Sequence, residues 1–218
     1  FFLDVWRVVI YMFLPIAFGI SIFLIQQGSP MTFKSSYQIE TLESGSMGIN
    51  EKGEPKPQTI VVGPVAAFES IKMLGTNGGG FYGTNSAHPY ENPTDLSNFI
   101  NTLAMMIFPF SLVLMYGRML NRWKHSLVIF SVMMLLMACT IIWSIYFDTL
   151  QPNPSLISHP SRTFELTPIP FNKIKFEIPS VVDLPVDQHL GNLEGKELRF
   201  GTSAGATFAA LTTNVTCG

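Results

Sequence analysis

Three long apolar runs constrain this chain more than any other feature of its sequence. They are VVIYMFLPIAFGISIFLI (8–25), FINTLAMMIFPFSLVLMY (99–116) and SLVIFSVMMLLMACTIIWSIY (126–146), and none contains a charged residue. A helix that crosses the hydrocarbon core of a bilayer needs about 20 mostly apolar residues. Each run therefore predicts a membrane-spanning helix. A buried core helix is the alternative for each run, but three such runs in 218 residues favour the bilayer.

The short connection between the second and third runs predicts the orientation of the chain. It holds three basic residues and no acidic one: Arg118, Arg122 and Lys124. An excess of Lys and Arg in short loops marks the cytoplasmic side of a membrane. The loop 118–125 is therefore expected to be cytoplasmic, and the longer segments 28–62 and 148–200 are expected to lie outside. Within the second of these, KIKFEIPSVV (173–182) predicts an edge strand.

Between the first two spans lies a helix-forming stretch of half the spanning length, followed by glycine-rich chain. GPVAAFESIKML (63–74) predicts a short helix, with Pro64 in its first turn and Gly75 just past its end. Five of the next nine residues are glycine. Irregular backbone at membrane depth is tolerated only where it is buried in protein or lines water. The pattern therefore predicts a re-entrant pore element.

The glycines of this element indicate a cation filter. Backbone carbonyl oxygens can replace the hydration shell of a cation when they point into a pore. Glycine reaches the required backbone angles without the cost that a Cβ imposes. Thr76 and Asn77 add oxygen atoms without a full charge, which suits a monovalent ion. The carbonyl groups expected to take part are those of Gly75, Gly78, Gly79 and Gly80.

A second stretch near the end of the chain repeats this pattern. GTSAGATFAALTTNVTCG (201–218) predicts another short helix followed by a turn of threonine and glycine. A shift of 140 positions superposes Ala66 on Ala206, Phe68 on Phe208, Thr76 on Thr216 and Gly78 on Gly218. The order of spans and half-length helices predicts an all-α membrane protein of about one and a half repeats, in which each repeat is a span, a re-entrant pore helix with its filter, and a further span.

Charged residues near the pore element have structural explanations. Glu69 and Lys72 are three residues apart on the short helix and are expected to pair, although Lys72 could also tune the potential of the pore. His88 and Glu91 could hold a metal or a proton, but we expect them to brace the segment that leads to the next span. Pro89 and Pro93 are expected to hold that segment extended.

Other functional classes find little support in the sequence. A formal net charge of −2 and the lack of a basic stripe give no indication of a nucleic-acid partner. Cys139 and Cys217 occur without a CxxC pair or a histidine at metal-ligand spacing, so neither a disulfide framework nor a zinc site is expected. GGGFYG (78–83) matches the dinucleotide fingerprint, but that motif needs a preceding strand and a following helix.

The residues after the short helix carry a family resemblance. GTNGGGFYGTNSAHPYENPTDLSNF (75–99) resembles the second filter region of the potassium-transporting ATPase A chains, the KdpA family. EGKELRFG (194–201), followed by TTNVTCG (212–218), resembles the approach to the third filter of that family. The likeness extends over nearly the whole chain and includes IQQG (25–28) at the end of the first span.

The resemblance implies a function and a set of site residues. It implies that K⁺ is bound by Thr76, Asn77 and Gly78 in one filter arm and by Thr216, Cys217 and Gly218 in the next, with Gly75, Gly79 and Lys72 of secondary importance. It also implies a bacterial inner-membrane subunit that is not itself an enzyme. ATP hydrolysis would belong to a separate P-type ATPase subunit, accompanied by small accessory membrane subunits. The family has four repeats, so the chain is expected to be a fragment.

Together these observations divide the chain into eight expected segments. They are a first span (1–27), an extracytoplasmic segment (28–62), a pore helix and filter (63–94), a second span (95–117), a cytoplasmic loop (118–125), a third span (126–147), a second extracytoplasmic segment (148–200) and a second pore helix with the start of its filter (201–218). The filters are expected to open to the extracytoplasmic side. Alternatives are a passive K⁺ channel or symporter subunit and a non-conducting membrane scaffold.

Overall fold

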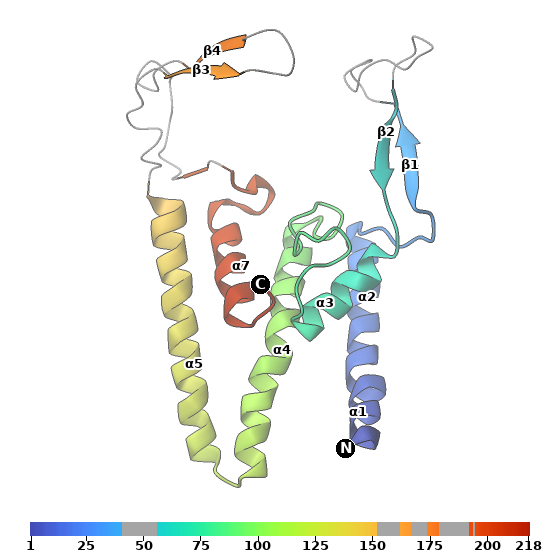
Figure 1. The fold of residues 1–218 in the computed structure, drawn as a ribbon. Helices are drawn as coiled ribbons and strands as arrows, with labels where there is room; N and C mark the ends of the chain where they lie inside the picture. Colours follow the sequence, from blue (N-terminus) through green and yellow to red (C-terminus); the bar gives the residue numbers. More distant parts are fainter. Residues whose placement is uncertain (41–55, 152–161, 167–173, 179–191, 194) are drawn as a thin grey trace. The chain divides into compact units, whose positions relative to one another are not determined.

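The computed structural model describes residues 1–40, 56–151, 162–166, 174–178, 192–193 and 195–218. It is mostly helical (Figure 1). Among these residues, three helices are long and apolar enough to cross a membrane, namely Phe2–Gln27, Asp95–Met119 and Trp123–Leu150. The chain forms two compact units, one of Phe1–Met133 with Leu211–Gly218 and one of Met134–Ala210.

The first span is one continuous helix with a local widening. It consists of α1 (Phe2–Val8), a π-helical turn η1 (Val9–Phe13) and α2 (Leu14–Gln27). The widened turn lies just before Pro15, whose missing N–H leaves the carbonyl of Tyr11 without its usual helical partner. Gly28 ends the helix with a φ of 110°, an angle that favours glycine.

A hairpin and a short helix follow the first span. β1 (Ser36–Ile39) and β2 (Gln58–Val61) pair in antiparallel fashion. α3 (Val65–Gly75) then begins after Pro64 and confirms the predicted short helix. Gly75 was expected just past the helix end, but it is the last helical residue. The left-handed position that ends a helix falls one residue later, at Thr76, where φ is 48°.

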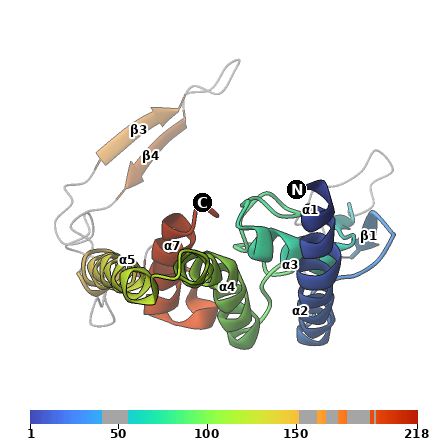
Figure 2. The same cartoon turned by 90° about the horizontal axis from the view of Figure 1, so that it is seen from below.

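α3 supplies the core of the first unit. It lies between α2 and α4 (Asp95–Met119), as Figures 1 and 2 both show. The amide of Ala66 donates to the carbonyl of Pro30, which ties the start of α3 to the end of the first span. The apolar side chains buried here come from all three helices and include Leu24, Val65, Met73, Leu74 and Met105. Between helices that cross a bilayer, such side chains hold the helices together by close van der Waals packing, because lipid tails are as apolar as the side chains themselves.

α4 begins with a complete capping box. The Thr94 hydroxyl accepts the amide N–H of Ser97 at 3.1 Å, and the Ser97 hydroxyl accepts that of Thr94 at 3.0 Å. Asp95 lies in the first turn, where a negative charge suits the helix dipole. Pro109 lies inside the helix. The capping box and Asp95 are the local sequence features that set where the second span begins.

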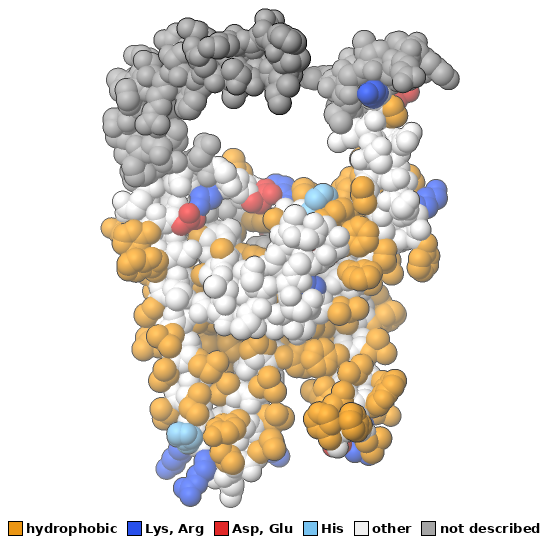
Figure 3. Space-filling view, viewed as in Figure 1, with side chains coloured by type: hydrophobic (Ala, Val, Ile, Leu, Met, Phe, Trp, Pro, Cys, Tyr) orange, Lys and Arg blue, Asp and Glu red, His pale blue; other side chains and the backbone are white. Residues whose placement is uncertain are grey.

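The turn between α4 and α5 (Trp123–Ser144) is tight. An ideal Cβ on Gly117 would lie 2.1 Å from the Cβ of Ser126, so the two helices touch through a glycine. The Ser126 hydroxyl donates to the carbonyl of Val113 at 2.7 Å. Figure 3 shows basic side chains gathered at the end of this helical hairpin, next to the hydrophobic surfaces of the helices.

The second unit contains the end of α5, a hairpin and the start of a further helix. α5 continues into a π-helical turn η2 (Ile145–Leu150). β3 (Arg162–Leu166) pairs with β4 (Ile174–Ile178) in antiparallel fashion. A 3₁₀ turn η4 (Leu198–Phe200) leads into α7 (Thr202–Asn214). The carbonyl of Ala206 in α7 accepts the Ser144 hydroxyl at 3.1 Å.

The strands correct the expectation of an all-α fold. The strand predicted within 173–182 is present as β4, but its partner β3 and the pair β1–β2 were not predicted. The four strands among the described residues are four or five residues long, and they pair as two antiparallel hairpins, β1 with β2 and β3 with β4. Such short strands leave little periodic pattern in a sequence. The described residues form a mostly helical protein with two β-hairpins.

The contact at Gly117 gives a prediction about stability. Gly117→Ala would place a methyl group inside the Ser126 side chain, and overpacking of this kind costs about 1–3 kcal/mol. The variant should lower the thermal midpoint of the complete detergent-solubilised protein. Gly19→Ala is the matched control, because Gly19 is in α2 and has nothing within 4 Å of its ideal Cβ. Equal midpoints for the two variants would contradict the close packing.

Candidate functional site

The segment that follows α3 has an unusual run of left-handed backbone angles. φ is 48° at Thr76 and then 69°, 79° and 98° at Gly78, Gly79 and Gly80. Residues with a Cβ rarely adopt such angles, because the side chain clashes with the neighbouring backbone. The glycines therefore permit a path that takes the chain out of the helix and back toward α4.

The segment that follows α7 has the same backbone pattern. φ is 63° at Thr216 and 90° at Gly218, which are 140 residues beyond Thr76 and Gly78. The carbonyl of Thr212 accepts the amide N–H groups of Cys217 at 2.9 Å and Gly218 at 3.1 Å. In both segments, therefore, a left-handed threonine lies within two residues of the end of a half-length helix, and a left-handed glycine follows two residues later.

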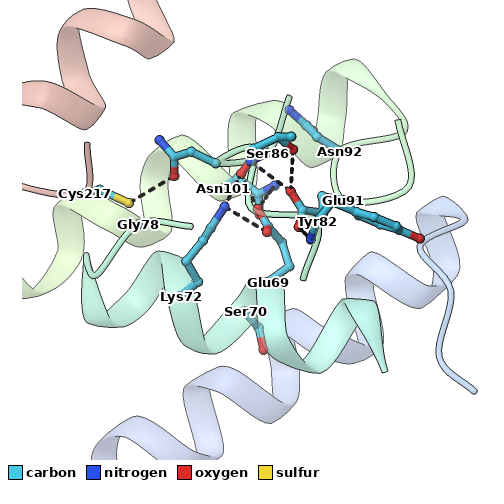
Figure 4. A network of polar contacts seen from close by, with 12 residues as sticks. Glu69, Ser70, Lys72, Gly78, Tyr82, Ser86, Glu91, Asn92, Asn101 and Cys217 are labelled. Atoms are coloured by element: carbon cyan, nitrogen blue, oxygen red, sulfur yellow. Dashed lines mark hydrogen bonds and ion pairs between the residues drawn. The ribbon is translucent and has the colours of Figure 1, made fainter. Parts of the chain in front are cut away.

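The structure brings these two segments into contact within the first unit. An ideal Cβ on Gly78 would lie 2.1 Å from the carbonyl oxygen of Cys217, a distance that real Cβ atoms do not show. Figure 4 shows Gly78 and Cys217 close to one another. Of the residues predicted for the site, Gly78 and Cys217 therefore meet directly, and only glycine fits at position 78.

Some backbone oxygens of the two segments accept hydrogen bonds and others, among the described residues, do not. Within the described part of the chain, no hydrogen bond reaches the carbonyl oxygens of Thr76, Asn77, Thr216 and Cys217. The carbonyl of Gly78 accepts the side-chain amide of Asn77 at 3.2 Å. The carbonyl of Gly79 accepts the backbone N–H of Asn85 at 2.7 Å, so its main role is within the loop.

A buried ion pair connects α3 to the chain that follows the glycines (Figure 4). The Lys72 ammonium lies 2.9 Å from Glu69, and the two side chains are 2% and 0% exposed. Lys72 also donates to the Ser86 hydroxyl at 2.6 Å, and that hydroxyl donates to Glu69. The amide of Asn101, in α4, donates to Glu69 at 3.3 Å. The predicted pairing of Glu69 with Lys72 is confirmed.

The physical role of this network follows from its burial. An isolated charge in a protein interior costs several kcal/mol, so the two side chains are tolerated because each compensates the other. Lys72 also lies in the last turn of α3, where the helix dipole favours a cation. Sequence reasoning did not identify Ser86 and Asn101 as partners, since neither residue is close to Glu69 along the chain.

A second buried carboxylate, Glu91, holds the loop itself. One of its oxygens accepts the backbone N–H of Tyr82 at 2.9 Å, and the other accepts that of Ser86 at 3.0 Å. The Thr84 hydroxyl lies 3.4 Å from the second oxygen. An ideal Cβ on Gly80 would lie 2.6 Å from this carboxylate, so glycine leaves room for it. The bracing role predicted for Glu91 is confirmed.

The segment around His88 differs from the expected extended chain. The carbonyl of His88 accepts the amides of Glu91 and Asn92, so the residues between Pro89 and Pro93 fold as a turn. Proline favours this outcome, because its fixed φ suits the first corner of a turn as well as extended chain. The ring of His88 stacks on the ring of Tyr82, with 3.8 Å between the ring centroids. Among the described residues, no cluster of three or more histidine, cysteine or acidic side chains could hold a metal.

The buried ion pair gives a test by double substitution. Lys72→Met or Glu69→Gln alone leaves a buried partner uncompensated, and breaking a buried pair costs about 3–5 kcal/mol. The double variant removes both charges and should have a higher thermal midpoint than either single variant. Asp4→Asn is the control, because Asp4 pairs with Arg7 on an exposed surface of α1 and should change little. If the double variant lowered the thermal midpoint by the sum of the two single effects, the pairing would be contradicted.

Glu91 gives a second prediction. Glu91→Gln replaces one accepting oxygen by an amide donor, so one backbone N–H of the loop loses its partner. A buried unsatisfied group costs about 1–3 kcal/mol, and the thermal midpoint should fall accordingly. Glu40→Gln, on an exposed residue that follows β1, should leave the midpoint unchanged. A normal midpoint for Glu91→Gln would argue against the brace.

Comparison with known proteins assigns the chain to a family. Residues 1–218 match the model of KdpA, the potassium-transporting ATPase A subunit. The potassium-transporting ATPase potassium-binding subunits of Caldanaerobacter subterraneus subsp. tengcongensis and Granulibacter bethesdensis are each 37% identical over the whole chain, which covers 32% of either relative. The subunit of the same name from Staphylococcus haemolyticus is 38% identical, with 33% of it covered. The chain therefore spans about a third of the length of these relatives, and it belongs to the KdpA family of potassium-transporting ATPase A subunits.

Proposed function

We propose that this chain is the part of a potassium-binding subunit that supplies two arms of a K⁺ filter. The first arm is Thr76–Gly78 and the second is Thr216–Gly218. The observation that carries the proposal is the direct approach of Gly78 to the carbonyl of Cys217, in segments where the carbonyls of Thr76, Asn77, Thr216 and Cys217 accept no hydrogen bond within the described residues. The relatives named above are potassium-binding subunits, which supports the choice of ion.

The chemistry of these arms suits a monovalent cation. A K⁺ ion loses its hydration shell on entering a filter, and neutral carbonyl oxygens can replace that shell without binding the ion too tightly to leave. Both arms also follow the C-terminal ends of helices, where the helix dipole is negative. A cation is therefore favoured at the arms without a carboxylate ring.

The length of α3 supports a re-entrant placement. Its 11 residues span roughly 16 Å at 1.5 Å per residue, about half the thickness of a bilayer core. It lies between two helices that are long enough to cross. Chain that enters part of the way and returns as irregular backbone must be lined by protein or water. With the basic α4–α5 turn on the cytoplasmic side, the arms would open to the outside.

Two arms do not surround an ion, so the remaining ligands would come from the rest of the full-length subunit. We place ATP hydrolysis in a separate P-type ATPase subunit of the same complex, together with small accessory membrane subunits. The complex would drive K⁺ uptake across the bacterial inner membrane. A passive channel or symporter of similar fold would differ in that transport would continue without ATP.

The proposal is tested at Gly78 in the complete transporter. Gly78→Ala should raise the K⁺ concentration needed for half-maximal ATPase activity by at least about tenfold, equivalent to about 1.4 kcal/mol. It should also reduce discrimination against Na⁺. The reason is the clash of the new methyl group with the carbonyl of Cys217. The measurements are K⁺-stimulated ATP hydrolysis and rubidium uptake.

Gly83→Ala separates this clash from backbone strain. Gly83 has a similar φ of 72°, but nothing lies within 4 Å of its ideal Cβ. Its K⁺ dependence should stay within about twofold of the unmodified protein, a free-energy change below about 0.5 kcal/mol. Normal K⁺ affinity in Gly78→Ala, in a complex that assembles normally, would rule out the filter assignment.

A further inference from the structure

Asn85 lies in the loop that follows the first arm. Its side chain takes part in neither the ion pair of Glu69 with Lys72 nor the contacts of Glu91. The backbone here is left-handed at two successive residues, with φ of 48° at Asn85 and 70° at Ser86. Asparagine tolerates this conformation better than most residues with a Cβ. The backbone N–H of Asn85 is held by the carbonyl of Gly79 at 2.7 Å. The position of the side chain is thus fixed from within the loop.

The Asn85 side chain connects this loop to the far end of the described chain. Its amide nitrogen donates to the hydroxyl of Thr212 at 2.9 Å, across a separation of 127 residues. Its amide oxygen accepts the thiol of Cys217 at 3.5 Å, and Figure 4 shows the Cys217 end of this contact. One side chain therefore bonds to the last turns of α7 and to the second arm.

Thr212 transmits this connection to the backbone of the second arm. Its hydroxyl accepts from Asn85, while its carbonyl accepts the amides of Cys217 and Gly218. Thr212 and Cys217 are buried, at 5% and 3% exposure. A shift of Thr212 would therefore move the carbonyl of Cys217, which lies against Gly78.

The chemistry of the contact requires an amide. Asn85 uses a donor and an acceptor at the same time, and both are neutral. Aspartate would keep the acceptor and lose the donor, and it would add a charge beside the arms. An apolar side chain would lose both contacts.

We propose that Asn85 is a positioning residue that locks the segment Thr216–Gly218 against Gly78. It sets the spacing between the two arms through Thr212 and Cys217, without contacting the ion itself. Its importance for K⁺ rests on the proposed function, because fixed spacing of carbonyl oxygens matters only if an ion binds between them. The lock itself is a property of the protein and can be measured separately.

The experiment uses two variants in the complete complex. Asn85→Gly removes the side chain, and glycine adopts the left-handed angle without strain. Thr212→Val removes the hydroxyl from the other side of the contact and keeps the shape of the side chain. Thr207→Val is the matched control, because the Thr207 hydroxyl donates to the carbonyl of Ser203 within the same helix.

Two readouts are taken on each variant. The first readout is the rate at which a maleimide alkylates Cys217, measured by peptide mass spectrometry. Loosening of the second arm exposes this thiol and should therefore raise the rate. The second is the K⁺ concentration for half-maximal ATPase activity. Asn85→Gly and Thr212→Val should each raise both values about fivefold, which corresponds to about 1 kcal/mol, and the double variant should match the larger single effect. Thr207→Val should change neither.

The readouts separate the lock from the filter. An unchanged alkylation rate in both variants would overturn the positioning role of Asn85. Faster alkylation with an unchanged K⁺ requirement would support the lock and would count against the proposed K⁺ site. Because Asn85 and Thr212 lie on opposite sides of the contact, either variant alone decides the question if the other does not assemble.

Discussion

Every buried peptide group that leaves a regular helix needs another hydrogen-bond partner, and this requirement governs the loop that follows α3. A lipid tail cannot accept or donate a hydrogen bond, so unpaired backbone costs several kcal/mol for each group. Glu91 meets part of this need by accepting backbone N–H groups from Tyr82 and Ser86. The loop is thus paired by a buried side chain instead of by a neighbouring strand.

After these N–H groups are paired, several backbone carbonyl groups still accept no hydrogen bond within the described residues. In the described residues, those of Thr76, Asn77, Thr216 and Cys217 accept no hydrogen bond. An arrangement of this kind would be unfavourable in a dry interior and is favourable where a cation or water can bind. In the segment after α3, Glu91 therefore holds the N–H groups of Tyr82 and Ser86, while the carbonyls of Thr76 and Asn77 accept no hydrogen bond within the described residues.

The sequence predicted the long helices, α3, β4 and the ion pair between Glu69 and Lys72, because each of these depends on residues that are near one another along the chain. It did not predict β1–β2 and β3, whose strands are too short to carry a clear pattern. It also missed the side-chain contacts of Ser86, Asn101 and Asn85 with partners that lie 14 to 132 residues away. Contacts at such separations depend on packing and leave no spacing to recognise.

The long separation between Asn85 and Thr212 also bears on how the protein is made. A ribosome adds about 5–20 residues per second, so the 127 residues between the two take roughly 6–25 s to synthesise. For that interval the loop after α3 exists without the helix that completes it. During that interval Gly78 and Asn85 lack the residues that they contact in the finished protein, Cys217 and Thr212, so the order of synthesis makes the approach of the two segments a late step in folding.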